Sequence, residues 1–261
     1  MKNIKLICLT FCGILLLYSC KKDNYDMPDG IITGALVDAQ TNGTLELSEN
    51  GNNGNGNSVV RMWVDNPAKY PAPANYDLAI NQDGTFSNST VFAEKYKVFP
   101  VGQSGPWQWL QNDTAKITVN SNQTTNVTFK VAPFFYISKP TVADSTVTFT
   151  VTKSTVATIT NNLSNSNNLL ILINNFNRVN TNICSNGPGN YYQNRWQYTV
   201  TNAILGTPYT PSAGTTPGGQ TYSFSFANMH MPKGTYYLRV AIFGSGSNGK
   251  WNYSPIVQIK L

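Results

Sequence analysis

Few residues of this 261-residue chain could carry out acid–base or metal chemistry. The chain has one histidine, His230, so neither a two-histidine zinc helix nor a histidine-based metal cluster can form. His230 lies in "ANMHMPKG", between two methionines and before a Pro-Lys-Gly turn, which favours a packed or capping histidine over a catalytic base. The sequence therefore predicts no metal site and no cofactor.

Carboxylates, the other common catalytic groups, are confined to one part of the chain. Eleven of the twelve acidic residues lie between Asp23 and Asp113, the twelfth is Asp144, and residues 145–261 contain none. A Ser-His-Asp triad needs an acid beside its histidine, and glycoside hydrolysis normally needs two carboxylates roughly 5–10 Å apart. We expect the acids of the first part to lie in turns, such as the hairpin turn "NQDG" at 81–84, and not to face one cleft. The chain is therefore predicted not to be an enzyme, with an unrecognised hydrolase as the weakest alternative.

The charge distribution also argues against nucleic acid as a partner. The formal net charge is +6, with seven Lys and Arg residues in 145–261, and with eight bases against eleven acids in 21–132. Because the seven bases are scattered, they do not form a stripe that could follow phosphates. The asymmetry indicates two separately composed halves, and the basic second half could meet an acidic partner or polysaccharide.

Aromatic residues are the remaining functional signal. The segment "GPWQWLQND" (105–113) places Trp107 and Trp109 on one side of an extended stretch, beside glutamine amides. Trp196 in "YYQNRWQY" and Trp251 in "KWNYS" have similar neighbours. A flat aromatic face beside amide side chains suits the apolar face and the hydroxyls of a sugar ring. These four residues are the candidate glycan-binding residues, although Trp and Tyr also fill the cores of β-sandwiches.

The first thirty residues have the layout of an export signal. Lys2 and Lys5 precede an almost wholly apolar run at 6–17, which is too short to span a bilayer comfortably. "LYSC" at 17–20 resembles a bacterial lipobox, in which the cysteine is diacylated after cleavage. We expect residues 1–19 to be a lipoprotein signal peptide, Cys20 to carry the lipid and residues 20–30 to form a tether; an ordinary signal with a chance cysteine is the alternative. Cys8 and Cys12 leave with the signal, so Cys184 has no cysteine with which to form an intramolecular disulfide.

The mature chain is predicted to be all-β, because nearly every periodic segment alternates with period two. The clearest strands are "TVTFTVT" (146–152), "YSFSF" (222–226), "TYYLRVAIF" (235–243), the fully apolar "LLILI" (169–173), and "KITV" with "NVTFKV" (116–119 and 126–131), which we interpret as a hairpin. About seven short strands lie on each side of the proline-containing stretch 131–142, which is typical of β-sandwiches. We therefore predict two sandwich domains, residues 31–132 and 133–261.

Three stretches carry a family resemblance: "DNYDMPDGIITGALVDAQTNGTL", "DGTFSNSTVFAEKYKVFPVGQSGPW" and "NVTFKVAPFFYI". They resemble a family of two-domain surface lipoproteins from glycan-foraging gut bacteria. The resemblance implies a transthyretin (prealbumin)-like domain followed by an immunoglobulin- or fibronectin-III-like domain. It also implies a place in a starch-utilisation-type (Sus-like) system, beside an outer-membrane transporter and its glycan-capturing lipoprotein. It supplies no catalytic residues. "DTA" and "DST" resemble the O-glycosylation acceptor of such bacteria, at Thr114 and Ser145.

Together these features predict a lipid-anchored outer-membrane protein, expected at the cell surface, that binds carbohydrate as a non-catalytic accessory to polysaccharide capture and uptake. The alternative is a structural subunit that braces the transporter complex and binds no sugar. Sugar binding requires exposed aromatic rings that lie in one plane. Bracing requires an exposed apolar patch of roughly several hundred Å² with a polar rim.

Overall fold

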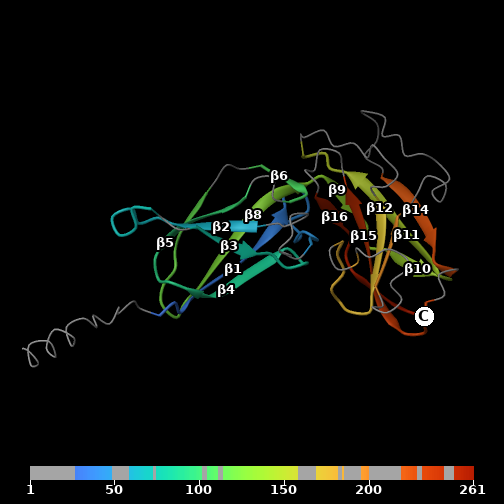
Figure 1. The fold of residues 1–261 in the computed structure, drawn as a ribbon. Coiled ribbons are helices and arrows are strands. Elements are labelled where there is room, and N and C mark those ends of the chain that lie inside the picture. The colour runs from blue at the N-terminus through green and yellow to red at the C-terminus, as the bar shows by residue number, and fades with distance from the viewer. Residues whose placement is uncertain are drawn as a thin grey trace, which may run out of the picture.

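The computed structural model describes residues 27–48, 59–72, 75–101, 105–110, 114–157, 169–181, 184, 195–199, 219–227, 231–243 and 250–261. These residues form an all-β protein, as predicted. In this part of the chain no helix has the length and hydrophobicity needed to cross a membrane. Figure 1 shows two sandwiches side by side, one built from β1–β8 and the other from β9–β17.

The N-terminal sandwich consists of two four-stranded sheets. Its strands are β1 (Gly30–Asp38), β2 (Val59–Val64), β3 (Asn75–Ala79), β4 (Thr85–Val91), β5 (Lys95–Pro100), β6 (Trp107–Trp109), β7 (Ala115–Thr118) and β8 (Thr124–Pro133). Sheet A has the order β4-β1-β8-β6 and sheet B the order β3-β2-β5-β7. One face of each sheet is apolar at every second residue, and these faces enclose a core that includes Ile32, Leu36, Val60 and Val98, each at most 1% exposed.

The predicted hairpin at 116–131 is wrong, although both of its strands exist. β7 pairs with β5 in sheet B, whereas β8 pairs with β1 and β6 in sheet A. The turn at 120–123, with Asn122 in the left-handed region (φ 56°), therefore carries the chain from one sheet to the other. Alternation indicates which side chains face a core, but both sheets share this core, so the pattern does not identify the partner strand.

The C-terminal sandwich has a second pair of sheets. Its strands are β9 (Phe135–Ile137), β10 (Thr141–Ala143), β11 (Thr146–Lys153), β12 (Leu169–Asn174), β13 (Arg195–Thr199), β14 (Gln220–Ser225), β15 (Thr235–Phe243), β16 (Trp251–Tyr253) and β17 (Val257–Lys260). Sheet C has the order β10-β11-β14 with β9 also beside β11, and sheet D the order β13-β12-β15-β16 with β17 also beside β15. Pro140 separates β9 from β10, and Pro255 separates β16 from β17, because proline has no N–H to donate to a ladder.

The apolar strand β12 is buried on both faces, as its sequence predicts. Ile171 and Ile173 face the core between sheets C and D, while Leu170 and Leu172 pack on the opposite side with Val179 and Tyr253. The outer face of sheet D is thus covered rather than exposed to solvent.

The two sandwiches are joined through the guanidinium of Arg239, which is 0% exposed on the outer face of β15. Its Nη2 donates to Oε2 of Glu46 at 2.8 Å and to the carbonyl of Gln82 at 3.3 Å, and its Nη1 donates to the carbonyl of Leu47 at 2.7 Å. All three acceptors belong to the N-terminal sandwich. One side chain of sheet D therefore holds two separate loops of the other sandwich.

Arg239 is fixed equally firmly within its own sandwich. Its Nε donates to the carbonyl of Ser254 at 2.7 Å and its Nη1 to that of Val179 at 3.3 Å. Its guanidinium carbon lies 4.6 Å from the centroid of the Tyr253 ring, a cation–π distance. The buried charge is thus compensated by one carboxylate, four carbonyls and an aromatic face.

Tyr136, on β9, joins the sandwiches at a second point. Its hydroxyl donates to Oδ1 of Asp38 at 2.9 Å and lies 3.2 Å from Oε1 of Gln40. Burial, together with the hydrogen bond to Asp38, raises the pKa of Tyr136 to about 12, so the hydroxyl keeps its proton at physiological pH. Nearby, Nδ2 of the buried Asn252 donates to the carbonyl of Pro106 at 3.0 Å.

Replacing Arg239 by Met should destabilise the protein by about 3–5 kcal/mol, because three buried and two partly buried acceptors lose their donor. A matched control is Arg61→Met, which removes an exposed Arg–Asp pair and should cost about 1 kcal/mol or less. Urea unfolding of both variants measures the difference. Equal losses for the two would contradict the central role of Arg239.

Candidate functional site: an aromatic row and an interdomain cleft

Three aromatic rings from three strands meet at the surface of the N-terminal sandwich. Trp63 on β2 contacts Phe99 on β5 edge-to-face, with ring centroids 5.4 Å apart at 90°. Phe99 in turn stacks on Trp109 of β6, at 6.4 Å and 12°. Trp63 is 43% exposed, and the other two rings are partly exposed. We call Trp63, Phe99 and Trp109 the aromatic row.

Strand alternation places the first two rings. In β2, Val60 and Met62 face the core, which directs Trp63 to the outer face of sheet B. In β5 the same alternation directs Phe99 outward. Trp63 lies opposite Lys97 in the antiparallel register, so Trp63 and Phe99 are diagonal neighbours on that face.

Trp109 reaches the row from the other sheet. It is on β6, the terminal strand of sheet A, where it lies opposite the buried Val131 of β8. Its ring packs partly against the core of the sandwich. The rest of its ring meets Phe99 of sheet B. The row therefore runs from the outer face of one sheet to the edge of the other.

Paired charges lie beside the aromatic row. Arg61 makes two bonds to Asp77, from Nε at 2.6 Å and from Nη2 at 2.8 Å, and Nζ of Lys97 lies 2.7 Å from Oδ1 of Asp65. The hydrogen bond from Arg61 lowers the pKa of Asp77, and the hydrogen bond from Lys97 lowers that of Asp65. Both carboxylates are therefore ionised at neutral pH, and these groups offer donors and acceptors to a polar ligand.

The structure separates the two tryptophans that the sequence placed together. Trp109 belongs to the aromatic row, but Trp107 is 2% exposed and lies in the core. A side chain at Gly105 would collide with the Trp107 ring, and the indole N–H has no hydrogen-bond partner among the described residues. Trp107 thus has no ring face to offer a glycan, because its side of the strand continues into the sandwich.

The other predicted site residues are scattered. Trp251, on sheet D, is partly buried, and its ring centroid lies 5.3 Å from that of Phe243. The backbone of Trp196 pairs with Ile173 in β13. Thr114 is exposed before β7, and Ser145 occupies the tight turn between β10 and β11 with φ 61°. Cys20 and His230 lie outside the described residues.

Sequence reasoning missed Trp63 and Phe99. The available signal was the alternation in "VVRMWV" and "KYKVFP", where a large aromatic residue occupies the same phase as Arg61 and Lys97. A single large apolar side chain in the polar phase of a strand is common, whereas several that form one exposed patch indicate a binding surface.

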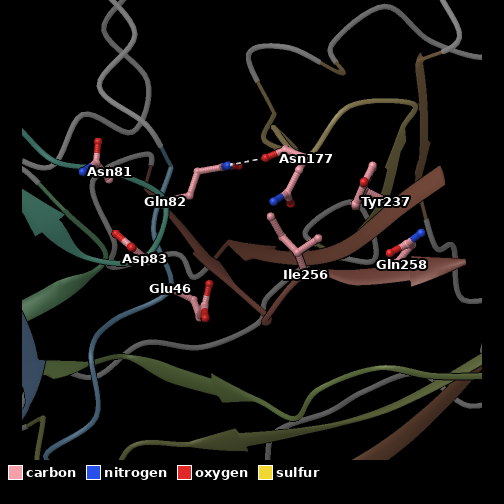
Figure 2. A pocket seen from close by; sticks show the side chains of 8 residues that line it. All are labelled: Glu46, Asn81, Gln82, Asp83, Asn177, Tyr237, Ile256 and Gln258. Atoms are coloured by element: carbon pink, nitrogen blue, oxygen red, sulfur yellow. Dashed lines mark hydrogen bonds between the residues drawn. The ribbon is translucent and has the colours of Figure 1, made fainter. Parts of the chain in front are cut away.

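A polar cleft of about 530 Å³ lies where the two sandwiches meet (Figure 2). The N-terminal sandwich contributes Glu46, Asn81, Gln82 and Asp83 to its lining, and the C-terminal sandwich contributes Asn177, Tyr237, Ile256 and Gln258. The expectation that no two acids face one cleft is therefore wrong, because Glu46 and Asp83 both line this one.

The turn "NQDG" at 81–84 lines the cleft, but the prediction that it is a hairpin turn is wrong. β3, before the turn, belongs to sheet B, whereas β4, after it, belongs to sheet A, and only the isolated bridge between Ile80 and Phe86 pairs the two sides.

The two carboxylates of the cleft are each engaged in structural contacts. Burial raises the pKa of Glu46, and the charge and hydrogen bond of Arg239 oppose this rise without reversing it. Oδ1 of Asp83 accepts hydrogen bonds from the N–H and hydroxyl of Thr85, at 3.1 and 2.7 Å. Within the described residues, no group of three or more His, Cys, Asp or Glu residues is arranged to hold a metal ion.

Comparison with known proteins identifies a family model for the first sandwich. Residues 30–132 match the N-terminal domain of a family described as "Protein of unknown function (DUF3823)". No curated protein matches the chain.

Several solved structures share the whole two-sandwich fold. A DUF3823 family protein from Bacteroides ovatus is 18% identical with a TM-score of 0.60, over 89% of this chain and 99% of that one. A DUF3823 family protein from Parabacteroides merdae is 20% identical with a TM-score of 0.59, over 90% and 100%. A protein from Bacteroides uniformis described as a "putative carbohydrate binding protein" is 18% identical with a TM-score of 0.56, over 90% and 100%.

Trp107 and Trp63 should differ sharply in their effect on stability. Trp107→Ala leaves a large cavity in the core and should cost about 3–5 kcal/mol, whereas Trp63→Ala removes an exposed ring and should change stability by about 0.5 kcal/mol. Urea unfolding monitored by circular dichroism provides the comparison. A similar loss in both variants would mean that Trp63 is a packing residue and not a surface ring.

Proposed function

We propose that this chain is a two-domain member of the DUF3823 family that binds polysaccharide, without catalysis, through the aromatic row of its N-terminal sandwich. The observation that carries the proposal is the contact of Trp63, Phe99 and Trp109 at one surface beside two ion pairs. The description of the Bacteroides uniformis neighbour as a "putative carbohydrate binding protein" supports the same substrate class.

The chemistry of a glycan chain fits this surface. The C–H face of a pyranose ring packs on an aromatic ring, while its hydroxyls seek donors and acceptors at the rim. Arg61, Asp77 and Lys97 lie beside the row and supply both. Phe99 and Trp109 have nearly parallel rings, at 12°, and come nearest to the one-plane arrangement that sugar binding requires. Trp63 stands at 90° to Phe99 and would contact a neighbouring sugar of the same polymer from a different direction.

The bracing alternative has a specific observation in its favour. Leu110, an apolar residue that is 36% exposed, directly follows Trp109 in the chain. A partner protein could cover this residue together with the aromatic row, with the ion pairs as the polar rim. An outer-membrane transporter and its glycan-capturing lipoprotein are the partners that this alternative requires.

We place the protein in the outer membrane, facing the cell surface, with Cys20 as its lipid attachment. Two or three acyl chains at about 0.8 kcal/mol per buried methylene would make the anchoring effectively permanent. The apolar run and the "LYSC" stretch at 17–20 support this location.

Lipid attachment is tested by expressing the full chain with a labelled fatty acid in a bacterium that processes lipoproteins. The wild type should incorporate label and partition with membranes, and Cys20→Ser should do neither. An unlabelled wild type in the soluble fraction would refute the anchor.

Glycan binding is tested by affinity electrophoresis of residues 21–261 in gels that contain plant, host or microbial polysaccharides. One glycan should retard the wild type, and Trp63→Ala or Trp109→Ala should weaken that binding by about tenfold or more, since each removes a stacking face. Phe92→Ala is the matched control, because Phe92 is an exposed aromatic residue of the same sandwich that lies outside the row.

The outcomes separate the proposals. Retardation that survives both tryptophan substitutions would keep the function and remove the row as its site. No retardation by any glycan would refute sugar binding at the row and favour bracing, which a pull-down of the transporter complex would then test.

A further inference from the structure

We propose that the interdomain cleft is a second binding site, specific for a short neutral saccharide of one or two sugar units. This site differs from the aromatic row in position, shape and charge, and it does not rest on the proposed function of the row. The argument comes from the size of the cleft, the chemistry of its lining and the contacts that hold that lining in place.

The cleft has the size of a small-molecule site. Its volume of about 530 Å³ falls in the range of about 300–1,000 Å³ that ligand pockets occupy. Figure 2 shows residues of both sandwiches around this space, with Gln82 reaching across toward Asn177. A mono- or disaccharide fits such a space.

The lining offers many acceptors to a ligand rich in hydroxyl groups. Glu46 uses Oε2 for Arg239, and Asp83 uses Oδ1 for Thr85. Within the described residues, Oε1 of Glu46 and Oδ2 of Asp83 accept no hydrogen bond. The amides of Asn81 and Gln258 supply further donors and acceptors at the exposed rim.

One wall of the cleft is apolar. Tyr237 and Ile256 are partly buried and pack against the small apolar cluster on the outer face of sheet D. A half-buried tyrosine ring opposite a set of carboxylates and amides matches the two faces of a sugar, one made of C–H groups and one of hydroxyls. This pairing distinguishes the cleft from a site for a bare ion.

The walls are held in place before any ligand binds. Gln82 connects them, because its Nε2 donates to the carbonyl of Asn177 at 3.1 Å and its Oε1 accepts from the N–H of Val179 at 2.8 Å. The first of these bonds is drawn in Figure 2. Arg239, buried behind the cleft, donates hydrogen bonds to Glu46 and to the carbonyl of Gln82 and so fixes both. A preformed site loses little conformational entropy on binding.

The charges of the lining select against acidic sugars. Glu46 and Asp83 are both acidic, and no Lys or Arg is among the eight lining residues. Arg239 compensates Glu46 but is fully buried, so Asp83 leaves the cleft with net negative charge. A uronic acid would therefore be repelled, and a neutral sugar accepted.

The test is an NMR titration of ¹⁵N-labelled protein, residues 21–261, with glucose, galactose, mannose, xylose, arabinose and their common disaccharides, and with glucuronic acid as the acidic comparison. At least one neutral sugar should shift the backbone amides of residues 81–84, 177 and 256–258, and glucuronic acid should not. Glucosamine separates hydroxyl recognition from attraction of a cation to Asp83, because preference for it over every neutral sugar would overturn the assigned class.

Two variants locate the binding. Tyr237→Leu keeps apolar bulk but removes the ring, and Gln258→Ala removes an exposed amide; each should weaken binding by about tenfold, the cost of one lost favourable contact. Lys260→Ala is the matched control, since Lys260 is exposed two residues further along β17 and does not line the cleft.

Failure of this inference is distinguishable from failure at the aromatic row. Trp63→Ala should leave the sugar-induced shifts at the cleft unchanged. If no sugar shifts the cleft amides at millimolar concentrations, or if the shifts occur only near Trp63 and Trp109, the cleft is not a saccharide site. Either result leaves the test of polysaccharide binding at the row untouched.

Discussion

The buried guanidinium of Arg239 is the interaction on which the arrangement of this protein depends. The C-terminal part of the chain has no acid after Asp144, so a fully buried arginine on sheet D has no carboxylate within reach in its own half. Glu46 of the other sandwich supplies it, together with two backbone carbonyls. An unpaired buried charge costs several kcal/mol, so separation of the sandwiches would require solvation of Arg239 at the exposed face of sheet D.

The bonds of Arg239 determine which segments of the two sandwiches meet at the domain junction. The loop at 45–47 and the turn at 81–84 both end on Arg239, and Gln82 then joins that turn to Asn177 and Val179. The junction is therefore made of directed hydrogen bonds rather than of apolar contact alone. Directed bonds fix orientation as well as distance, which gives the cleft one defined shape.

The sequence allowed the strands to be predicted but not how distant segments meet. "TYYLRVAIF" predicts β15 at its observed bounds, and the apolar run of β12 correctly predicts burial on both faces. The partner of β7 could not be predicted, because two sheets compete for the same alternating strand. Trp107 and Trp109 share one side of β6, and only the depth of each position in the sandwich separates a core ring from a surface ring. Glu46, Gln82 and Arg239 meet across more than 150 residues of chain, a contact that no local pattern encodes.

The two candidate sites have opposite electrostatic character, which follows from their positions. The outer face of sheet B carries Lys95, Lys97 and Arg61 beside the aromatic row, with Asp65 and Asp77 as partners. The cleft has the carboxylates of Glu46 and Asp83 in its lining, whereas the guanidinium of Arg239 that pairs with Glu46 is buried and does not line it. A glycan that carries acidic groups would therefore prefer the row, and a neutral chain end would prefer the cleft. Because the row lies wholly on the N-terminal sandwich whereas the cleft needs both, loss of the Arg239 junction would abolish the cleft and leave the row intact.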